Sequence, residues 1–121
     1  APLGRGFLTG QLRSTANLDD SDFRRNNPRF APGNLEQNMR IVDAVEAVAV
    51  EVDATPAQVA LAWLLAQGDH VVPIPGTKRV ARLEENAAAE HVVLSAEHLS
   101  RLAGIAPPVG DRYPDMTRVN R

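Results

Sequence analysis

Residues Ile74–Asn86 read IPGTKRVARLEEN, in which a Pro-Gly turn separates a short apolar run from a helix with cations in its first turns. The run Val71–Ile74 is rich in β-branched residues and lies between breakers, a pattern typical of a buried parallel strand. Thr77 is placed to cap the following helix. Because a helix N-terminus presents unpaired N–H groups and a positive dipole end, it attracts phosphate. We therefore predict a strand, a turn and a helix with an anion site at the start of the helix.

This helix is expected to separate its polar from its apolar side chains. At about 100° per residue, Arg82, Glu85 and Asn86 cluster on the side opposite Val80 and Leu83. A planar guanidinium suits a phosphate or a purine face, and the carboxylate and amide suit an adenine edge. The same spacing also fits an ordinary amphipathic helix with a solvated polar face, and spacing alone leaves both interpretations open.

A second candidate anion-binding segment is Ala1–Gly10, which reads APLGRGFLTG. Its three glycines and one proline predict a loop, and closely spaced glycines let backbone N–H groups approach an anion. A flexible turn without a ligand is the alternative for such a short glycine-rich segment.

The rest of the chain contains residues that typically begin and end helices. Asn34 and Gln37 resemble a capping box for a helix over about 35–52, and Thr55-Pro56-Ala57-Gln58 is a strong start for a second helix that should end near Gly68. A last helix is expected over 96–103 after Ser95. With the strand before residue 75, this order is an α/β pattern.

Composition excludes several classes of protein. The 121 residues are 44% apolar with a formal net charge of −2, so a general nucleic-acid binder is not expected. There is no cysteine, which excludes disulfides and thiol catalysis. No apolar run reaches membrane-spanning length and the N-terminus lacks a signal-peptide pattern, so we expect a soluble cytoplasmic protein. We expect no metal site, because the acidic run Asp19–Asp22 lacks calcium-loop spacing and the histidines lack metal-ligand partners.

Two motifs together carry a family resemblance. Pro2–Gly10 resembles the segment after barrel strand seven in aldo-keto reductases, and Val72–Asn86 resembles strand eight and helix eight. Phe23–Phe30 and Gly110–Pro114 resemble a loop and a tail of the long-loop branch, which includes pyridoxal-reductase-like members. The likeness covers nearly all 121 residues in one order. It implies an α/β fold in which residues 1–121 form the C-terminal portion of a single (β/α)₈ TIM-barrel domain, with strand eight and the last helices, mostly helical as an isolated chain.

The resemblance also implies an NADP(H) site, with cations favouring the 2′-phosphate over NAD(H). The barrel often binds phosphate at the loops after strands seven and eight. In that arrangement the pyrophosphate would be held by Pro2, Leu3, Gly4, Arg5 and Gly6. The adenosine 2′-phosphate would lie among Gly76, Thr77, Lys78 and Arg82, with Ile74 in the preceding strand, and adenine would contact Glu85 and Asn86.

The implied activity is NADPH-dependent reduction of aldehydes or ketones to alcohols by the parent protein. The family's catalytic Asp, Tyr, Lys and His come from earlier strands, and no match for them exists in this sequence; Tyr113 and Lys78 belong to other motifs. We therefore expect the chain to be inert without its partner, the N-terminal part of the same barrel. Alternatives are a non-catalytic NADPH-binding scaffold or channel-associated subunit on the same barrel, and a free-standing helical interaction module. A helix-turn-helix is disfavoured because its second helix would present apolar residues to DNA.

Overall fold

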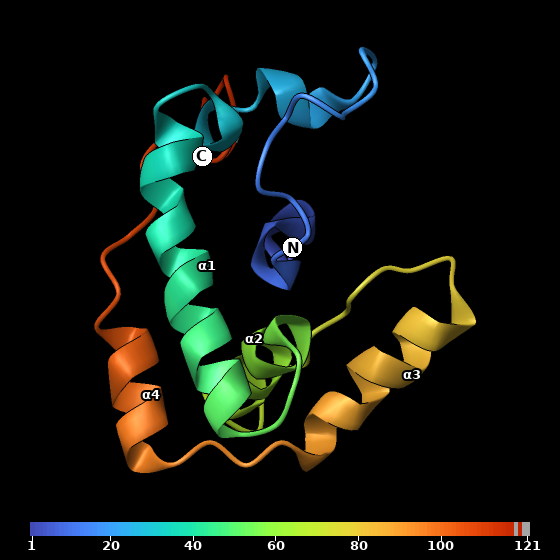
Figure 1. Ribbon diagram of the computed structural model, residues 1–121, viewed down its shortest axis with the longest axis vertical. Helices are drawn as coiled ribbons and strands as arrows, with labels where there is room; N and C mark the ends of the chain where they lie inside the picture. The colour runs from blue at the N-terminus through green and yellow to red at the C-terminus, as the bar shows by residue number, and fades with distance from the viewer. Residues whose placement is uncertain (118, 120–121) are drawn as a thin grey trace.

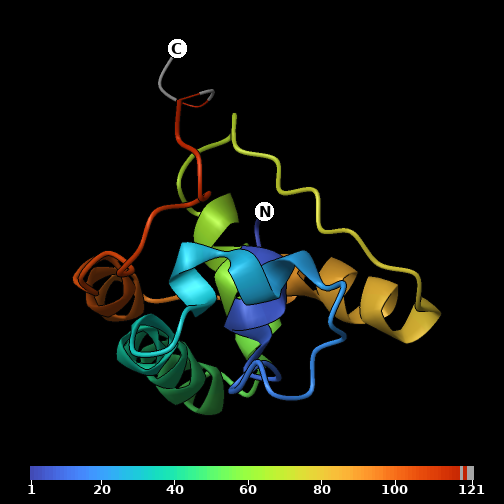
Figure 2. The same ribbon diagram turned by 90° about the horizontal axis from the view of Figure 1, so that it is seen from above.

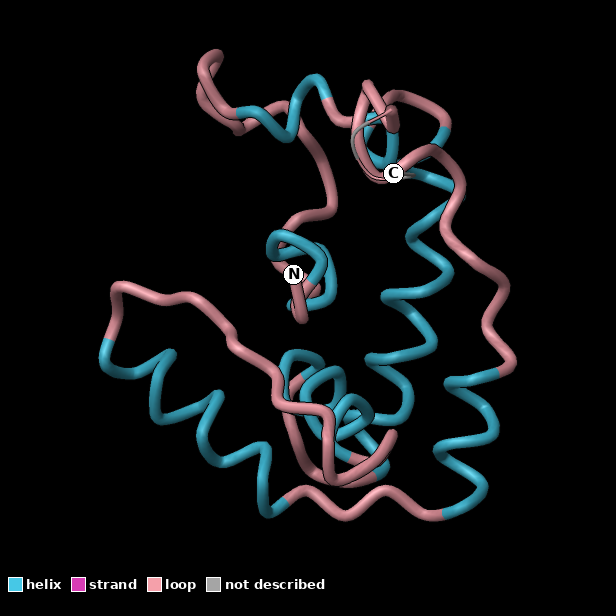
Figure 3. Tube along the Cα trace, turned by 180° about the vertical axis from the view of Figure 1, so that it is seen from behind, coloured by secondary structure: helices cyan, strands magenta, loops and turns pink. Residues whose placement is uncertain are grey.

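The computed structural model describes residues 1–117 and 119, and in this part of the chain all regular structure is helical (Figure 1; Figure 3). The elements, in chain order, are the 3₁₀ turns η1 (Gly4–Thr9), η2 (Phe23–Asn26) and η3 (Pro28–Phe30), the helices α1 (Asn34–Glu51), α2 (Pro56–Leu65) and α3 (Val80–Ala88), the turn η4 (Ala89–His91) and the helix α4 (Ala96–Ala103).

Helix α1 begins at a different cap from the one predicted. Gly33, with φ 82°, is the N-cap residue, and its backbone N–H donates to the Glu36 carboxylate. The predicted Asn34–Gln37 capping box is therefore wrong. Asn34 instead donates through Nδ2 to the Pro28 carbonyl at 2.9 Å, which ties the helix start to η3.

Two of the predicted helix starts, at Thr55 and Ser95, are confirmed. Thr55 accepts from the Gln58 N–H at 3.2 Å, and Gln58 Oε1 accepts from the Thr55 N–H at 3.0 Å. These reciprocal bonds make a capping box, with Pro56 at the first helical position. Ser95 caps α4, which spans the predicted residues 96–103.

The core lies where α1 crosses α2 and the N-terminal turns. Val45, Val48 and Ala49 of α1 pack with Val59 of α2. A second cluster joins the other half of α1 to the N-terminal segment through Phe7, Leu12, Phe30, Leu35 and Val42. The Phe7 and Phe30 rings meet edge to face with centroids 6.0 Å apart. This packing fixes the N-terminal loop against α1 and α2.

The predicted buried strand at Val71–Ile74 is wrong for the described residues. The segment runs as a loop from α2 to α3 (Figure 2), and Val72 and Ile74 are 75% and 83% exposed. A strand exists only when neighbouring chains satisfy its N–H and C=O groups. Within residues 1–117, no segment is paired with this one as a strand.

Helix α3 presents its faces in an unusual way. Its apolar side is exposed to solvent, since Val80 and Leu83 are 72% and 59% exposed. Glu85 and Asn86, on the side that faces α2, are half-buried. In Figure 1, α3 stands apart from the α1–α4 side of the molecule. The polar side of α3 is therefore the one that faces the rest of the chain.

Among the described residues, no single helix is both long enough and apolar enough to cross a membrane. In this part of the chain, only α1 and α2 taken together have that length and composition, and they are bent by 90° with respect to each other.

Candidate functional site

A pocket of about 490 Å³ opens between the N-terminal loop, the start of α2 and the segment that leads into α3. It brings together residues from both sequence motifs. The predicted cofactor residues that line it are Pro2, Leu3, Arg5 and Gly6 from the first motif, and Gly76, Thr77, Arg82, Glu85 and Asn86 from the second. Segments about seventy residues apart in the sequence thus form two walls of one pocket.

Three other predicted residues lie outside this pocket. Gly4 lines a second, smaller pocket of about 210 Å³. Ile74 and Lys78 are exposed and are not among the lining residues. Their predicted contacts with the cofactor remain predictions.

The N-terminal wall has an uncommon backbone. Gly4, Arg5 and Gly6 all have positive φ, at 58°, 61° and 91°. The Gly4 and Gly6 amides do not face a ligand, because they donate to the carbonyls of Ala1 and Leu3 at 3.1 and 3.0 Å. Any anion at this wall would therefore be recognised mainly by side chains rather than by these two amides.

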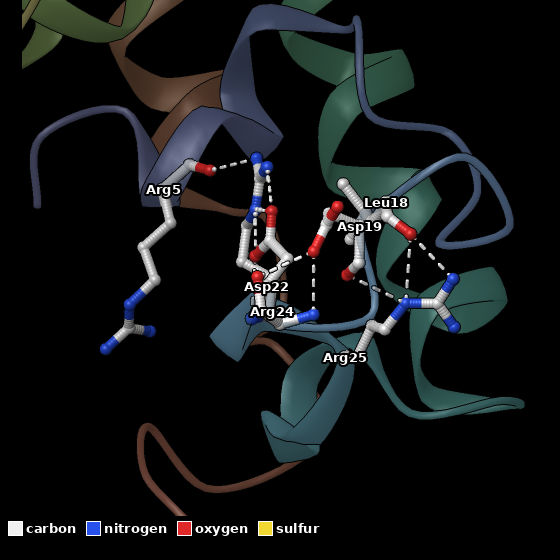
Figure 4. A network of polar contacts seen from close by, with 7 residues as sticks. Arg5, Leu18, Asp19, Asp22, Arg24 and Arg25 are labelled. Carbon is white, nitrogen blue, oxygen red and sulfur yellow. Dashed lines mark hydrogen bonds and ion pairs between the residues drawn. The ribbon is translucent and has the colours of Figure 1, made fainter.

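Arg24 holds this wall in place. It donates from Nη1 to the Arg5 carbonyl at 3.3 Å and from Nη2 to Asp22 at 2.6 Å (Figure 4). These side-chain bonds lower the pKa of Asp22 to about 2 and raise the pKa of Arg24. Arg24 also lines the pocket. It is thus a cation fixed by one carboxylate, with a carbonyl of the loop as its second partner.

The α3 wall carries a second cation. Arg82 Nη1 lies 2.6 Å from Glu85 Oε2, one helical turn away. Burial acts to raise the pKa of Glu85, but hydrogen bonds from Arg82 and Thr55 oppose it and the net shift is downward. Glu85 is thus held as a carboxylate, and an incoming phosphate would compete with it for Arg82.

Thr77 is not the cap of α3, which corrects the sequence prediction. Arg79 is the N-cap residue and has no side-chain cap. The Thr77 hydroxyl accepts from the Arg79 N–H at 3.1 Å, so it forms a local turn before the helix begins. This turn places Thr77 at the pocket.

The start of α2 anchors α3. Gln58, whose Oε1 closes the capping box, donates through Nε2 to the Glu85 carbonyl at 3.0 Å. Thr55, the other half of the box, contacts the Glu85 carboxylate. One local motif therefore both starts a helix and fixes the position of the second wall.

Tyr113 and His98 do not line this pocket. Tyr113 lies on the C-terminal segment, 38% exposed. His98 accepts from the Ser95 N–H through Nδ1, and its Nε2 lies 3.0 Å from Glu51. Across residues 1–117 and 119, no three His, Asp or Glu side chains gather in a way that could hold a metal ion.

Sequence reasoning missed several residues that the fold brings to the pocket. They are Ala1, Thr9, Gln11, Leu12, Leu18, Arg24, Ala57 and Pro75. Arg24 was the most visible of them, because a cation two residues after an aspartate in a polar loop signals a local ion pair. Its proximity to Arg5 depends on the fold and has no local signal.

Comparison with protein-family models matches residues 1–107 to the Aldo/keto reductase family. Among curated proteins, the chain is 47% identical over 117 residues to the NADP(+)-designated aldo-keto reductase yakc of Schizosaccharomyces pombe, a match covering 94% of this chain and 34% of that protein. It is 41% identical over 119 residues to aldo-keto reductase str7 of Strobilurus tenacellus, covering 96% and 35%. It is 42% identical over 111 residues to probable aldo-keto reductase 1 of Glycine max, covering 92% and 32%.

The chain thus spans about a third of the length of these curated relatives, between 32% and 35%. The family match covers both walls of the pocket, together with α1, α2, α3 and α4. The chain belongs to the Aldo/keto reductase family.

Proposed function

We propose that this chain forms the adenosine-phosphate end of an NADP(H) site in a reductase that converts aldehydes or ketones to alcohols. The family implies a TIM barrel and an oxidoreductase activity in the parent protein. The observation that carries the proposal is the pocket that joins Arg5 and Gly6 to Thr77, Arg82 and Asn86.

The chemistry of the pocket suits a phosphorylated adenosine. Among the residues that the structure describes, Arg5, Arg24 and Arg82 line it, against a single lining carboxylate, that of Glu85. A guanidinium binds phosphate through two parallel N–H donors, and such charge-assisted bonds are stronger than neutral ones. Asn86 offers both a donor and an acceptor to a purine edge. A cofactor with an additional phosphate gains more from these cations than one without it, which favours NADP(H).

The reaction itself requires groups outside this chain. When bound, the cofactor supplies the hydride, and the protein must polarise the carbonyl and donate a proton. We assign those roles to the N-terminal part of the same barrel, whose strands would also pair with Val71–Ile74 and cover the apolar side of α3. The isolated chain is therefore expected to be inert with any aldehyde.

The test measures cofactor affinity in the full-length polypeptide by quenching of its tryptophan fluorescence, with Arg82→Ala as the variant. Loss of one charge-assisted bond costs about 1.5–3 kcal/mol, so the Kd for NADPH should rise at least roughly tenfold, with little change for NADH. Arg79→Ala is the matched control, because Arg79 starts the same helix but does not line the pocket.

Three outcomes separate the candidates. NADPH binding with carbonyl-dependent loss of absorbance at the reduced nicotinamide band supports the reductase. NADPH binding without turnover of aldehydes, ketones or pyridoxal-like carbonyls identifies the non-catalytic scaffold. Equal Kd values for NADPH and NADH in the wild type, unchanged by Arg82→Ala, would overturn the assignment of the pocket.

A further inference from the structure

The C-terminal segment Val109–Tyr113 is fastened to the structure at one end by a buried amide. Asn38 of α1 is only 1% exposed. Its Oδ1 accepts from the Val109 N–H at 2.7 Å, and its Nδ2 donates to the Val109 carbonyl at 2.9 Å and to the Arg29 carbonyl at 3.1 Å. A side chain that pairs with both backbone groups of one residue fixes the segment in position and direction.

The η2–η3 region holds the rest of this segment. Asn27, 3% exposed, donates from Nδ2 to the Arg112 carbonyl at 2.9 Å, and Arg29 donates to the Gly110 carbonyl at 3.2 Å. Gly110 has φ +93°, and a Cβ there would lie 2.8 Å from the Pro28 carbonyl group. The approach is so close that only glycine fits without displacing the segment.

The fastened segment ends against Arg5. The Arg5 guanidinium lies over the Tyr113 ring, 4.8 Å from its centroid, and 5.6 Å from the centroid of Phe23. It also donates from Nη1 to the Arg112 carbonyl at 3.4 Å. Figure 4 shows the Arg5 carbonyl turned toward Arg24 while the Arg5 side chain extends away from it. The backbone of Arg5 is therefore held by Arg24, and its side chain by the segment Val109–Tyr113.

We propose that Val109–Tyr113 positions the side chain of Arg5, a residue that lines the pocket, and that Tyr113 is a positioning residue for the affinity of a phosphate-bearing ligand. This inference rests on the proposed function, because the ligand is taken to be NADP(H). A free arginine loses considerable side-chain entropy when it binds an anion. An arginine already held against an aromatic ring has lost part of that freedom beforehand, which raises affinity by preorganisation.

The experiment measures the Kd for NADPH in the full-length polypeptide for Tyr113→Ala and Tyr113→Phe, each in the wild-type and in an Arg5→Ala background. An exposed cation–π contact corresponds to roughly a two- to fivefold change in Kd. We expect Tyr113→Ala to weaken binding by about that factor, and Tyr113→Phe to retain the wild-type Kd because the ring remains. In the Arg5→Ala background, Tyr113→Ala should have no further effect, since there is no guanidinium left to position.

A second variant displaces the segment without changing Tyr113. Gly110→Ala pushes the segment off Pro28, so it should weaken NADPH binding when Arg5 is present and leave the Kd unchanged when Arg5 is absent. Thermal unfolding of each variant shows whether the fold is retained.

The outcomes distinguish this inference from the function on which it rests. If the wild type does not bind NADPH, the proposed function fails and the inference fails with it. If the wild type binds NADPH but Tyr113→Ala binds equally well, only the inference is overturned. It is likewise overturned if the loss persists in the Arg5→Ala background, because Tyr113 would then act by a route other than Arg5.

Discussion

The two walls of the pocket are built in opposite ways. Three contacts hold the N-terminal wall. Arg24 bonds the Arg5 carbonyl, the Tyr113 ring packs against the Arg5 guanidinium, and the Phe7 ring packs against that of Phe30. The α3 wall depends on the start of α2, through the Gln58–Glu85 bond and the Thr55 contact. One wall is fixed by many long-range contacts, whereas the other rests on one capping motif.

This difference shows which wall needs further contacts. The N-terminal wall buries Phe7 and Leu12, but the segment around the second wall leaves Val72, Ile74, Val80 and Leu83 exposed. Large exposed apolar side chains grouped in one part of the chain are typical of an interaction surface. On our proposal, the remainder of the barrel covers this surface. The N-terminal wall is then largely preformed, and the α3 wall becomes rigid only when its apolar side is covered.

The largest effect on stability is expected from Asn38→Ala, which removes the side chain that holds the segment Val109–Tyr113 against α1. The substitution leaves the Val109 N–H and two carbonyls, those of Val109 and Arg29, without their partner. Each buried unsatisfied group costs about 1–3 kcal/mol, so unfolding in urea should be easier by about 3 kcal/mol or more. Asn26→Ala is the control, because Asn26 is exposed at the end of η2, next to Asn27. Equal urea midpoints for the two variants would mean that the segment Val109–Tyr113 is not a structural part of this wall.

Next in size is a change that loosens only the α3 wall. Gln58→Glu keeps an acceptor for the Thr55 N–H, and therefore the capping box, but removes the donor to the Glu85 carbonyl. A lost hydrogen bond of this kind costs about 1 kcal/mol, so amide hydrogen exchange in residues 82–88 should quicken roughly fivefold. The N-terminal wall should keep its exchange rates.

Gln67→Glu is the matched control for this prediction. It makes the same substitution at a glutamine just after the end of α2, whose Nε2 donates to the Trp63 carbonyl of that helix at 2.9 Å. We expect no change in α3. If both variants quicken exchange in α3 equally, the added charge and not the lost bond is responsible.

How far each wall could be predicted from sequence follows from the range of the interactions involved. The Thr55-Pro56-Ala57-Gln58 and Ser95 caps depend on atoms within three residues, so the sequence identifies them directly. The same rule failed at Asn34, because Gly33 at φ 82° offers Glu36 a partner and leaves Asn34 to bond Pro28. Two overlapping motifs competed there, and the contact with η3 decided between them.

Long-range features were harder to predict. The apolar run Val71–Ile74 has the composition of a strand, but strand pairing depends on neighbours that no local pattern specifies. The family resemblance of the two motifs predicted that they share one cofactor site. It did not predict the part played by Arg24, or by Asn27 and Asn38, which hold the segment Val109–Tyr113. Their roles arise from contacts 19 to 85 residues apart in the chain.

A smaller effect on stability, dependent on pH, is expected from the Arg24–Asp22 pair of the N-terminal wall. The pKa of Asp22 is about 2 in the folded chain, below the ordinary value of about 3.9 for an unfolded chain. Because the folded pKa is lower, the pair contributes stability above about pH 4, and this contribution is lost as the pH falls toward 2. Asp22→Asn should therefore lower the urea midpoint at pH 7 and converge on the wild type near pH 2.

Asp20→Asn is the control for general charge effects. The Asp20 carboxylate is fully exposed and lies 3.5 Å from the Arg25 guanidinium. A difference between Asp22→Asn and the wild type that stays constant from pH 7 to 2 would contradict the ionic role of Asp22. The substitution would then act through packing alone.

The smallest effect on stability, and the most direct probe of the α3 wall, is expected from Glu85→Gln. The Arg82 side chain is 47% exposed, so its ion pair with Glu85 contributes at most about 0.5 kcal/mol. The substitution leaves a group that can still contact adenine, but it removes the carboxylate that competes with phosphate for Arg82. NADPH should therefore bind more tightly, by roughly two- to threefold, while the urea midpoint hardly moves. Glu84→Gln changes the net charge equally at an exposed neighbour outside the pocket. Tighter binding in both variants would point to net charge, whereas weaker binding in Glu85→Gln alone would show that the carboxylate itself holds the cofactor.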